Sequence, residues 1–182
     1  MTGFAPVEPA TATGKTAAPG CGRAEGPRPD AEHDQGDGQQ PGPPQGYLAL
    51  NGGLSSGVLP APVHELLAVT TAEYNGCEYC LSAHTYIGAN TAKIDATDLE
   101  AARDAKASDP RTQALLTLSD TIARDHGQVD DAAPQAARGA GATDDEIGEV
   151  VGHLALNVLT NYFNILAEVD NDRPVVTPRI AA

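Results

Sequence analysis

The chain has 182 residues, and its 25 acidic and 11 basic side chains give it a formal net charge of −14. A surface this acidic repels phosphate backbones and anionic lipid headgroups, so we expect neither nucleic-acid binding nor membrane-surface binding. No run of 18 apolar residues predicts a spanning helix, and the N-terminus has neither the basic nor the apolar region of a secretory signal. The length alone predicts one domain, and the cysteine usage described below leads us to expect it in the cytoplasm.

Residues 1–46 are rich in glycine and proline, and Met1, Phe4 and Val7 are their only large apolar side chains. Such a segment cannot bury enough apolar surface to offset its ordering entropy, so we predict a disordered tail. Cys21 lies in this tail, and we interpret it as a surface thiol without a role. With only three cysteines, two of them close together, a catalytic or metal-binding thiol pair in a reducing compartment fits better than a secreted disulfide scaffold.

The folded part is predicted to cover residues 47–172, with 173–182 as a C-terminal extension. Apolar residues there recur at three- and four-residue spacings, and no alternating strand pattern is convincing. With proline and glycine as boundaries, the pattern predicts a short helix or packed loop over 47–59, interrupted at Gly52-Gly53, and then helices over about 60–75, 77–89, 98–107, 110–127, 131–138 and 144–169. The predicted class is all-α, a single helical bundle.

Two helix starts have the sequence of a capping box: Thr97 with Glu100, and Thr143 with Glu146. The last helix carries an apolar stripe that we expect to face the core: Ile147, Val150, Val151, Leu154, Val158, Tyr162, Ile165 and Val169. It also carries a polar strip, which could line a pocket or a subunit interface but which we predict to face solvent: His153, Asn157, Thr160 and Asn164. Because alanines are many and aromatics few, the core is thin, and we expect a homo-oligomer.

The residues with the clearest chemistry lie between Glu65 and His84. Cys77 and Cys80 form a Cys-x-x-Cys pair at the start of a predicted helix, and His84 follows one turn later on the same side. Thiols three residues apart can bond to each other, and the helix N-terminus favours the thiolate, which is the nucleophile. His84 can accept a thiol proton, while Glu65, from the preceding helix, can relay a proton near Cys77 or orient His84.

Other interpretations of these residues compete with redox chemistry. Cys77, Cys80 and His84 could be three zinc ligands, with His64, Glu65 or His153 as the fourth. The two cysteines could also be inert and buried. A thioredoxin-type site is disfavoured because there the motif follows a strand, whereas the flanks here are helical. We predict His64 to be a surface residue on the side of its helix away from Glu65.

Residues of about 47–172 resemble the alkylhydroperoxidase D-like, carboxymuconolactone decarboxylase superfamily. The resemblance rests on Glu65, the twelve-residue step to the Cys77-Glu78-Tyr79-Cys80 motif, His84 and the Asn161-Tyr162-Phe163-Asn164 segment of the last helix. Where the best-studied members of the family carry a histidine between the cysteines, this chain has Tyr79. The decarboxylase branch lacks the cysteine pair.

The resemblance implies an all-helical fold, usually in trimers or hexamers, and a cysteine-based peroxidase or disulfide reductase activity; of these we expect a hydroperoxide reductase with an antioxidant role. In that scheme Cys80 is the attacking thiolate, Cys77 resolves the intermediate, and His84 with Glu65 moves protons. We accordingly expect a hydroperoxide substrate and a small thiol, a lipoyl group or a thioredoxin-like protein as electron donor; no motif calls for a metal or organic cofactor. A protein disulfide reductase or redox sensor, or a carboxymuconolactone decarboxylase-like enzyme, is the alternative.

Overall fold

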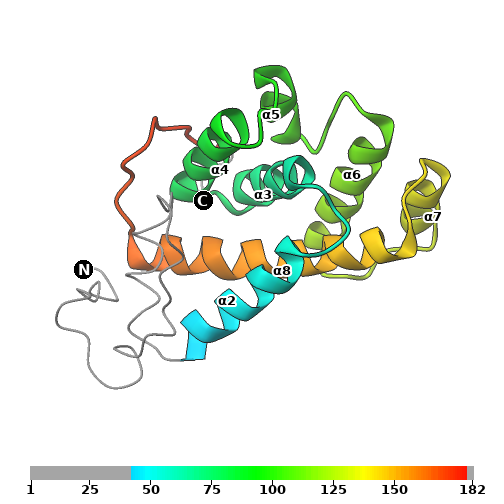
Figure 1. Cartoon of the computed structure of the whole chain (residues 1–182), viewed down its shortest axis with the longest axis horizontal. Coiled ribbons are helices and arrows are strands. Elements are labelled where there is room, and N and C mark those ends of the chain that lie inside the picture. Colours follow the sequence, from blue (N-terminus) through cyan, green and yellow to red (C-terminus); the bar gives the residue numbers. More distant parts are fainter. Residues whose placement is uncertain (1–41, 180–182) are drawn as a thin grey trace.

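The computed structural model describes residues 42–179, so the predicted tail lies outside the described residues as far as position 41. Within 42–179 the structure consists of seven α-helices without a strand, which confirms the all-α class. The helices are α2 (Gly42–Ser55), α3 (Ala61–Asn75), α4 (Glu78–Asn90), α5 (Ala96–Ala102), α6 (Pro110–Arg124), α7 (Ala132–Gly139) and α8 (Asp144–Ala167) (Figure 1).

Helix α3 is the centre of the domain. It contacts α4, α5, α6 and α8, and every residue from Leu66 to Glu73 is buried. A helix surrounded in this way is buried on all sides rather than on one face. In Figure 1, α8 runs along one side of the bundle with α2 beside it, α4 and α5 lie on the opposite side of α3, and α6 stands beside α3 and reaches down to α8. The dithiol helix α4 therefore packs directly on the most deeply buried helix.

Several predicted helix boundaries are confirmed, because local chemistry sets them. Gly76 takes a left-handed conformation (φ 69°) and ends α3. The Asp109 side chain accepts from the backbone N–H of Thr112 and caps α6. At α8 both hydrogen bonds of the predicted capping box between Thr143 and Glu146 are present.

Two local predictions are wrong. The sequence Thr97–Glu100 does not form a capping box, because α5 begins earlier, with Asp95 as its N-cap, and ends at Ala102. Helix α2 begins at Gly42, so the last five residues of the predicted tail, 42–46, are helical, and it continues through Gly52-Gly53 rather than being interrupted there. A glycine costs a helix only about 1 kcal/mol, and α2 packs on α8, where a side chain at Gly152 would collide with Leu54.

The last described residues run back over the bundle in extended form (Figure 1). Val176 N donates to Ser82 Oγ of α4 over 2.9 Å, and Arg179 N donates to Glu73 Oε1 of α3 over 2.6 Å. Glu73 is buried, and its second oxygen accepts from Arg103 Nε. A paired charge is the condition under which a carboxylate can be buried, so this segment helps to satisfy the interior of the domain.

Helix α8 presents its faces differently from the prediction. The predicted polar strip is buried, all four of its residues at 6% exposure or less, while Val151, Tyr162 and Ile165 of the predicted core stripe are exposed. Leu159 and Leu166 are exposed with them. By length and composition α8 also qualifies as a candidate membrane span, but 39% of that stretch is buried inside the domain, and core helices of soluble proteins meet the same criteria.

Candidate active site

Cys77 and Cys80 are joined by a disulfide, and their Cα atoms lie 5.3 Å apart. Cys77 is the N-cap of α4, and its Sγ accepts from the backbone N–H of Cys80 over 3.3 Å. Cys80 lies in the first turn of the same helix, and both residues are buried. The pair is thus built on one helix N-terminus, where unpaired backbone N–H groups stabilise negative charge on sulfur.

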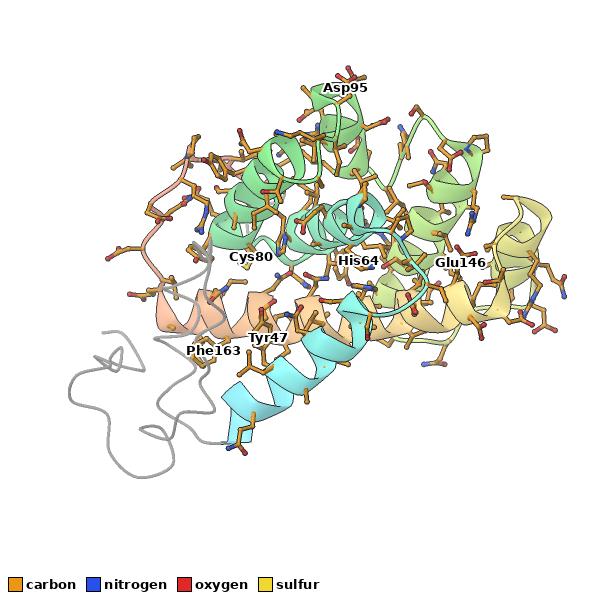
Figure 2. All side chains as sticks on the ribbon, in the orientation of Figure 1. Tyr47, His64, Cys80, Asp95, Glu146 and Phe163 are labelled. Atoms are coloured by element: carbon orange, nitrogen blue, oxygen red, sulfur yellow. A yellow bond between two sulfur atoms is a disulfide. The ribbon has the colours of Figure 1, made fainter. Side chains whose placement is uncertain are left out.

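Cys80, but not Cys77, lines a cleft between α2, α4 and α8. The cleft has an empty volume of about 440 Å³, including the part that is open to solvent. Figure 2 shows Cys80 on the side of α4 that faces α8, with Tyr47 of α2 nearby. The cleft is lined by Tyr47, Asn51, Tyr79, Cys80, Ala83, His84, Leu156, Asn157 and Thr160.

The buried polar strip of α8 supplies polar groups to this region. Asn164 Nδ2 donates to Cys80 Sγ over 3.3 Å, and Asn157 and Thr160 form part of the cleft wall. The neighbouring Asn161 accepts from Asn75 Nδ2 over 3.0 Å, which ties α8 to the end of α3. Burial of an amide is costly without hydrogen bonds, and Asn75 and Cys80 each supply one partner to these two amides on the inward face of α8.

The fold brings Glu65 and His84 together, as the interpretation that Glu65 orients His84 requires. His84 Nδ1 lies 2.8 Å from Glu65 Oε2, and both side chains are partly buried. With the carboxylate accepting from Nδ1–H, the neutral ring carries its lone pair on Nε2. His84 shares the cleft with Cys80, so the ring that Glu65 orients belongs to the same site as the sulfur.

Tyr79, which stands between the two cysteines, is held from the C-terminal segment. Arg173 Nη1 donates to the Tyr79 hydroxyl oxygen over 3.3 Å, and the guanidinium lies 5.7 Å from the ring centroid. Tyr79 is buried and also lines the cleft. A phenol in this position cannot serve as the base that an imidazole would be at neutral pH, so we interpret it as a cleft wall.

His64 and His153, which the sequence offered as possible zinc ligands, do not line the cleft that contains Cys80. The ring of His64 contacts the ring of His153, with the two centroids 4.2 Å apart, and Glu149 lies beside both. His64 is therefore not the surface residue that was predicted. The inward orientation of the polar face of α8 was not predicted, because Asn164 and its neighbours were expected to face solvent. The contribution of α2 to the cleft was not predicted either, because only its apolar residues were considered.

Comparison with known proteins agrees with the fold. Residues 41–108 match the carboxymuconolactone decarboxylase family. No curated protein is similar enough in sequence to count as a relative. Among solved structures, the chain is similar to an uncharacterized peroxidase-related protein from Ralstonia eutropha JMP134 with an alkylhydroperoxidase AhpD core, at 22% identity, with 78% of this chain and 76% of that chain covered and a TM-score of 0.70.

Two further structures share the fold. One is an uncharacterized peroxidase-related protein from Silicibacter sp. TM1040, at 19% identity, with 75% and 73% of the two chains covered and a TM-score of 0.67. The other is a protein of unknown function from Agrobacterium tumefaciens, at 18% identity, with 76% and 94% covered and a TM-score of 0.59. The family match over residues 41–108 and the shared fold agree with the resemblance to the alkylhydroperoxidase D-like, carboxymuconolactone decarboxylase superfamily that the sequence indicates.

Proposed function

We propose that the protein is a thiol-dependent hydroperoxide reductase that cycles between the Cys77–Cys80 dithiol and its disulfide. The observation that carries this proposal is the disulfide itself, formed at the N-terminus of α4 with Cys80 facing a cleft that also contains His84. The peroxidase-related names of the structural neighbours agree with it.

Cys80 is the attacking residue in this scheme, because it is the cysteine of the pair that lines the cleft. Its thiolate attacks the terminal oxygen of the hydroperoxide, the O–O bond breaks, and the alcohol leaves with one proton while Cys80 becomes a sulfenic acid. The amide of Asn164, 3.3 Å from Cys80 Sγ, is placed to donate to the thiolate and so to favour the reactive form.

Cys77 is the resolving residue. Its sulfur attacks the sulfenic sulfur of Cys80, a disulfide forms, and the oxygen leaves as water. Reduction then needs two electrons from an external dithiol, which ends as a disulfide while Cys77 and Cys80 return to thiols. We propose a small thiol, a lipoyl group or a thioredoxin-like protein as this donor.

His84 and Glu65 move the protons of the cycle. The Nε2 lone pair of His84 accepts the Cys80 proton, directly or through water, and the resulting imidazolium is stabilised by Glu65 at 2.8 Å. The imidazolium can then protonate the leaving alkoxide. The catalytic set is therefore Cys80, Cys77 and His84, with Glu65 positioning His84.

The proposal is tested with single-cysteine variants. Stopped-flow consumption of cumene hydroperoxide by the reduced protein is compared for wild type, Cys80→Ser and Cys77→Ser, with Cys21→Ser as the matched control for loss of a thiol outside the site. We expect Cys80→Ser to abolish turnover, Cys77→Ser to allow a single oxidation that stops at the sulfenic acid, and Cys21→Ser to equal wild type. Equal rates for Cys80→Ser and wild type would exclude the mechanism.

A protein disulfide reductase or redox sensor is the second candidate, because the same disulfide at a helix N-terminus would serve it. The Cys77–Cys80 reduction potential, together with the turnover of hydroperoxide, separates the two functions. The matched family also carries the name of lactone decarboxylation. An assay with carboxymuconolactone tests that activity, and turnover that survives in the Cys80→Ser variant would favour it over thiol chemistry.

A further inference from the structure

A second cluster of chemically capable side chains lies apart from the dithiol, where α3 faces the first half of α8. His64 of α3 and Glu149 and His153 of α8 each place a ligand-type atom within 4.8 Å of the other two. Figure 2 shows His64 between these two helices. Glu149 and His153 are four residues apart and therefore project from the same side of α8, toward His64.

Two nitrogen atoms in this cluster have no partner. His153 is 4% exposed, and its Nε2 is buried without a hydrogen bond; the Nε2 of His64 is in the same condition. Leaving a buried polar atom unsatisfied costs about 1–3 kcal/mol, so two neighbouring cases in one cluster require an explanation. A group that accepts lone pairs from both rings at once would remove both penalties.

The protonation states suit such a group. Burial, followed by the proximity of His64, lowers the pKa of His153 to about 4, so its ring is neutral at pH 7 and offers a lone pair. Partial burial would raise the pKa of Glu149, but the backbone N–H groups of Leu59 and Val58 outweigh it, and the net shift is downward. The cluster thus presents two imidazoles and one carboxylate.

The carboxylate is also fixed in position. Leu59 N donates to Glu149 Oε2 over 2.9 Å, and Val58 N donates to Oε1. A Cβ at Gly57 would collide with this carboxylate, so a side chain at position 57 would have to displace the Glu149 carboxylate. Each carboxylate oxygen has two lone pairs, so these hydrogen bonds leave room for a further ligand.

We propose that His64, Glu149 and His153 bind one divalent transition-metal ion, with zinc as the leading choice. Two imidazoles and a carboxylate are a zinc ligand set that leaves one position for water. The ligand atoms of tetrahedral zinc lie about 3.3 Å apart, so the ligand atoms of these three side chains must approach one another by about 1.5 Å or less. Rotation of the side chains accommodates this movement. The net charge of −14 favours the approach of a cation.

This site contains no cysteine, and none of its three side chains lines the cleft that contains Cys80. The ion would join the α2–α3 loop, α3 and α8, because Glu149 already holds that loop and the two histidines come from the two helices. A metal ion that binds the folded chain but not the unfolded chain raises the free energy of unfolding. The readouts are therefore metal stoichiometry and melting temperature, neither of which depends on peroxide turnover.

The test uses full-length oxidised protein with Cys21 alkylated, so that no thiol competes for metal. After treatment with a chelator and its removal, Zn²⁺ and Co²⁺ are titrated by equilibrium dialysis with metal analysis, and melting is followed with and without Zn²⁺. Variants are His64→Gln and His153→Gln, with His126→Gln as the control at an exposed histidine. Circular dichroism in chelator establishes that each variant is folded, and the partly exposed His64 gives the variant least prone to misfolding.

We expect one equivalent of metal per chain in wild type and in His126→Gln, and a rise in melting temperature of about 5 °C or more at a hundredfold excess over Kd. His64→Gln should bind at least about tenfold more weakly and lose that rise. Absence of stoichiometric binding in wild type, or unchanged binding in folded His64→Gln, would overturn the proposal. A Cys77→Ser, Cys80→Ser double variant should keep the metal while losing peroxidase activity, which separates this proposal from the previous one.

Discussion

Asn164 Nδ2 donates a hydrogen bond to Cys80 Sγ over 3.3 Å, although 84 positions of sequence separate the two residues. The contact joins the far end of the longest helix to the first turn of the dithiol helix. It exists because α8 turns a polar face inward at this point, and it places a fixed donor beside the sulfur that faces the cleft.

The first prediction concerns this contact. Replacement Asn164→Ala removes a donor to the Cys80 thiolate, and since a hydrogen bond to a charged group contributes about 1.5–3 kcal/mol, we expect the pKa of the Cys80 thiol to rise by about one unit or more. The pH dependence of alkylation of the reduced protein by iodoacetamide measures this. Asn157→Ala is the control, because Asn157 lines the same cleft but donates to the carbonyl of His153. An unchanged alkylation profile in Asn164→Ala would contradict the assigned role.

The second prediction concerns Glu65. Glu65→Gln keeps the size of the side chain but removes the charge that stabilises the His84 imidazolium, so we expect peroxide turnover to fall by about tenfold or more. Glu78→Gln, at an exposed carboxylate directly after Cys77, is the control for a general loss of negative charge near the dithiol. If the two variants lose the same activity, Glu65 does not stabilise the His84 imidazolium during turnover.

The third prediction concerns the exposed apolar strip of α8. Leu159, Tyr162, Ile165 and Leu166 are 42–58% exposed in the single chain, and an apolar strip of this kind marks an association surface. We expect sedimentation velocity to give a multiple of the 18.7 kDa chain mass, and the double replacement Tyr162→Lys, Leu166→Lys to give the single chain. Val175→Lys, at a comparably exposed apolar residue outside α8, should leave the assembly intact. A wild-type protein that sediments as one chain would refute this prediction.

The fourth prediction concerns pH and His153. Its folded-state pKa of about 4 lies below the ordinary 6.5, so between these values the unfolded chain binds the proton and the folded chain does not. Stability is therefore full above about pH 6.5 and falls as the pH drops toward 4, by about 2–3 kcal/mol from this group. Urea unfolding in chelator at several pH values measures it. His153→Gln should show a shallower fall and His126→Gln the wild-type fall; identical slopes in all three proteins would argue against the assignment.

The fifth prediction compares the two sequences that read as capping boxes. Thr143 caps α8 through its side chain, so Thr143→Ala should lower the free energy of unfolding by about 1 kcal/mol. Thr97 is exposed and makes no capping bond, so Thr97→Ala should change it by less than about 0.5 kcal/mol. Denaturant unfolding of both variants checks this, and a loss at Thr97 equal to that at Thr143 would show that α5 begins differently in solution.

The sequence by itself determined the features that depend on neighbours along the chain. The start of α6 after Asp109, the end of α3 at Gly76 and the position of the dithiol at the start of α4 follow from capping, turn geometry and helical spacing, all of which act within one or two turns. The spacing from Glu65 through Cys77 and Cys80 to His84 also predicted the all-helical fold through its family resemblance, and it predicted which residues to look for at the site.

Only the tertiary structure decided which way α8 faces. Its apolar and polar residues each form a plausible face, and the choice depends on what lies opposite: Cys80 and Asn75 offer hydrogen bonds to Asn164 and Asn161, so the amides turn inward and Tyr162 outward. For the same reason the meeting of His64 with His153 could not be predicted. Contacts between residues distant in sequence depend on how whole helices pack, and the local pattern of one helix does not contain that information.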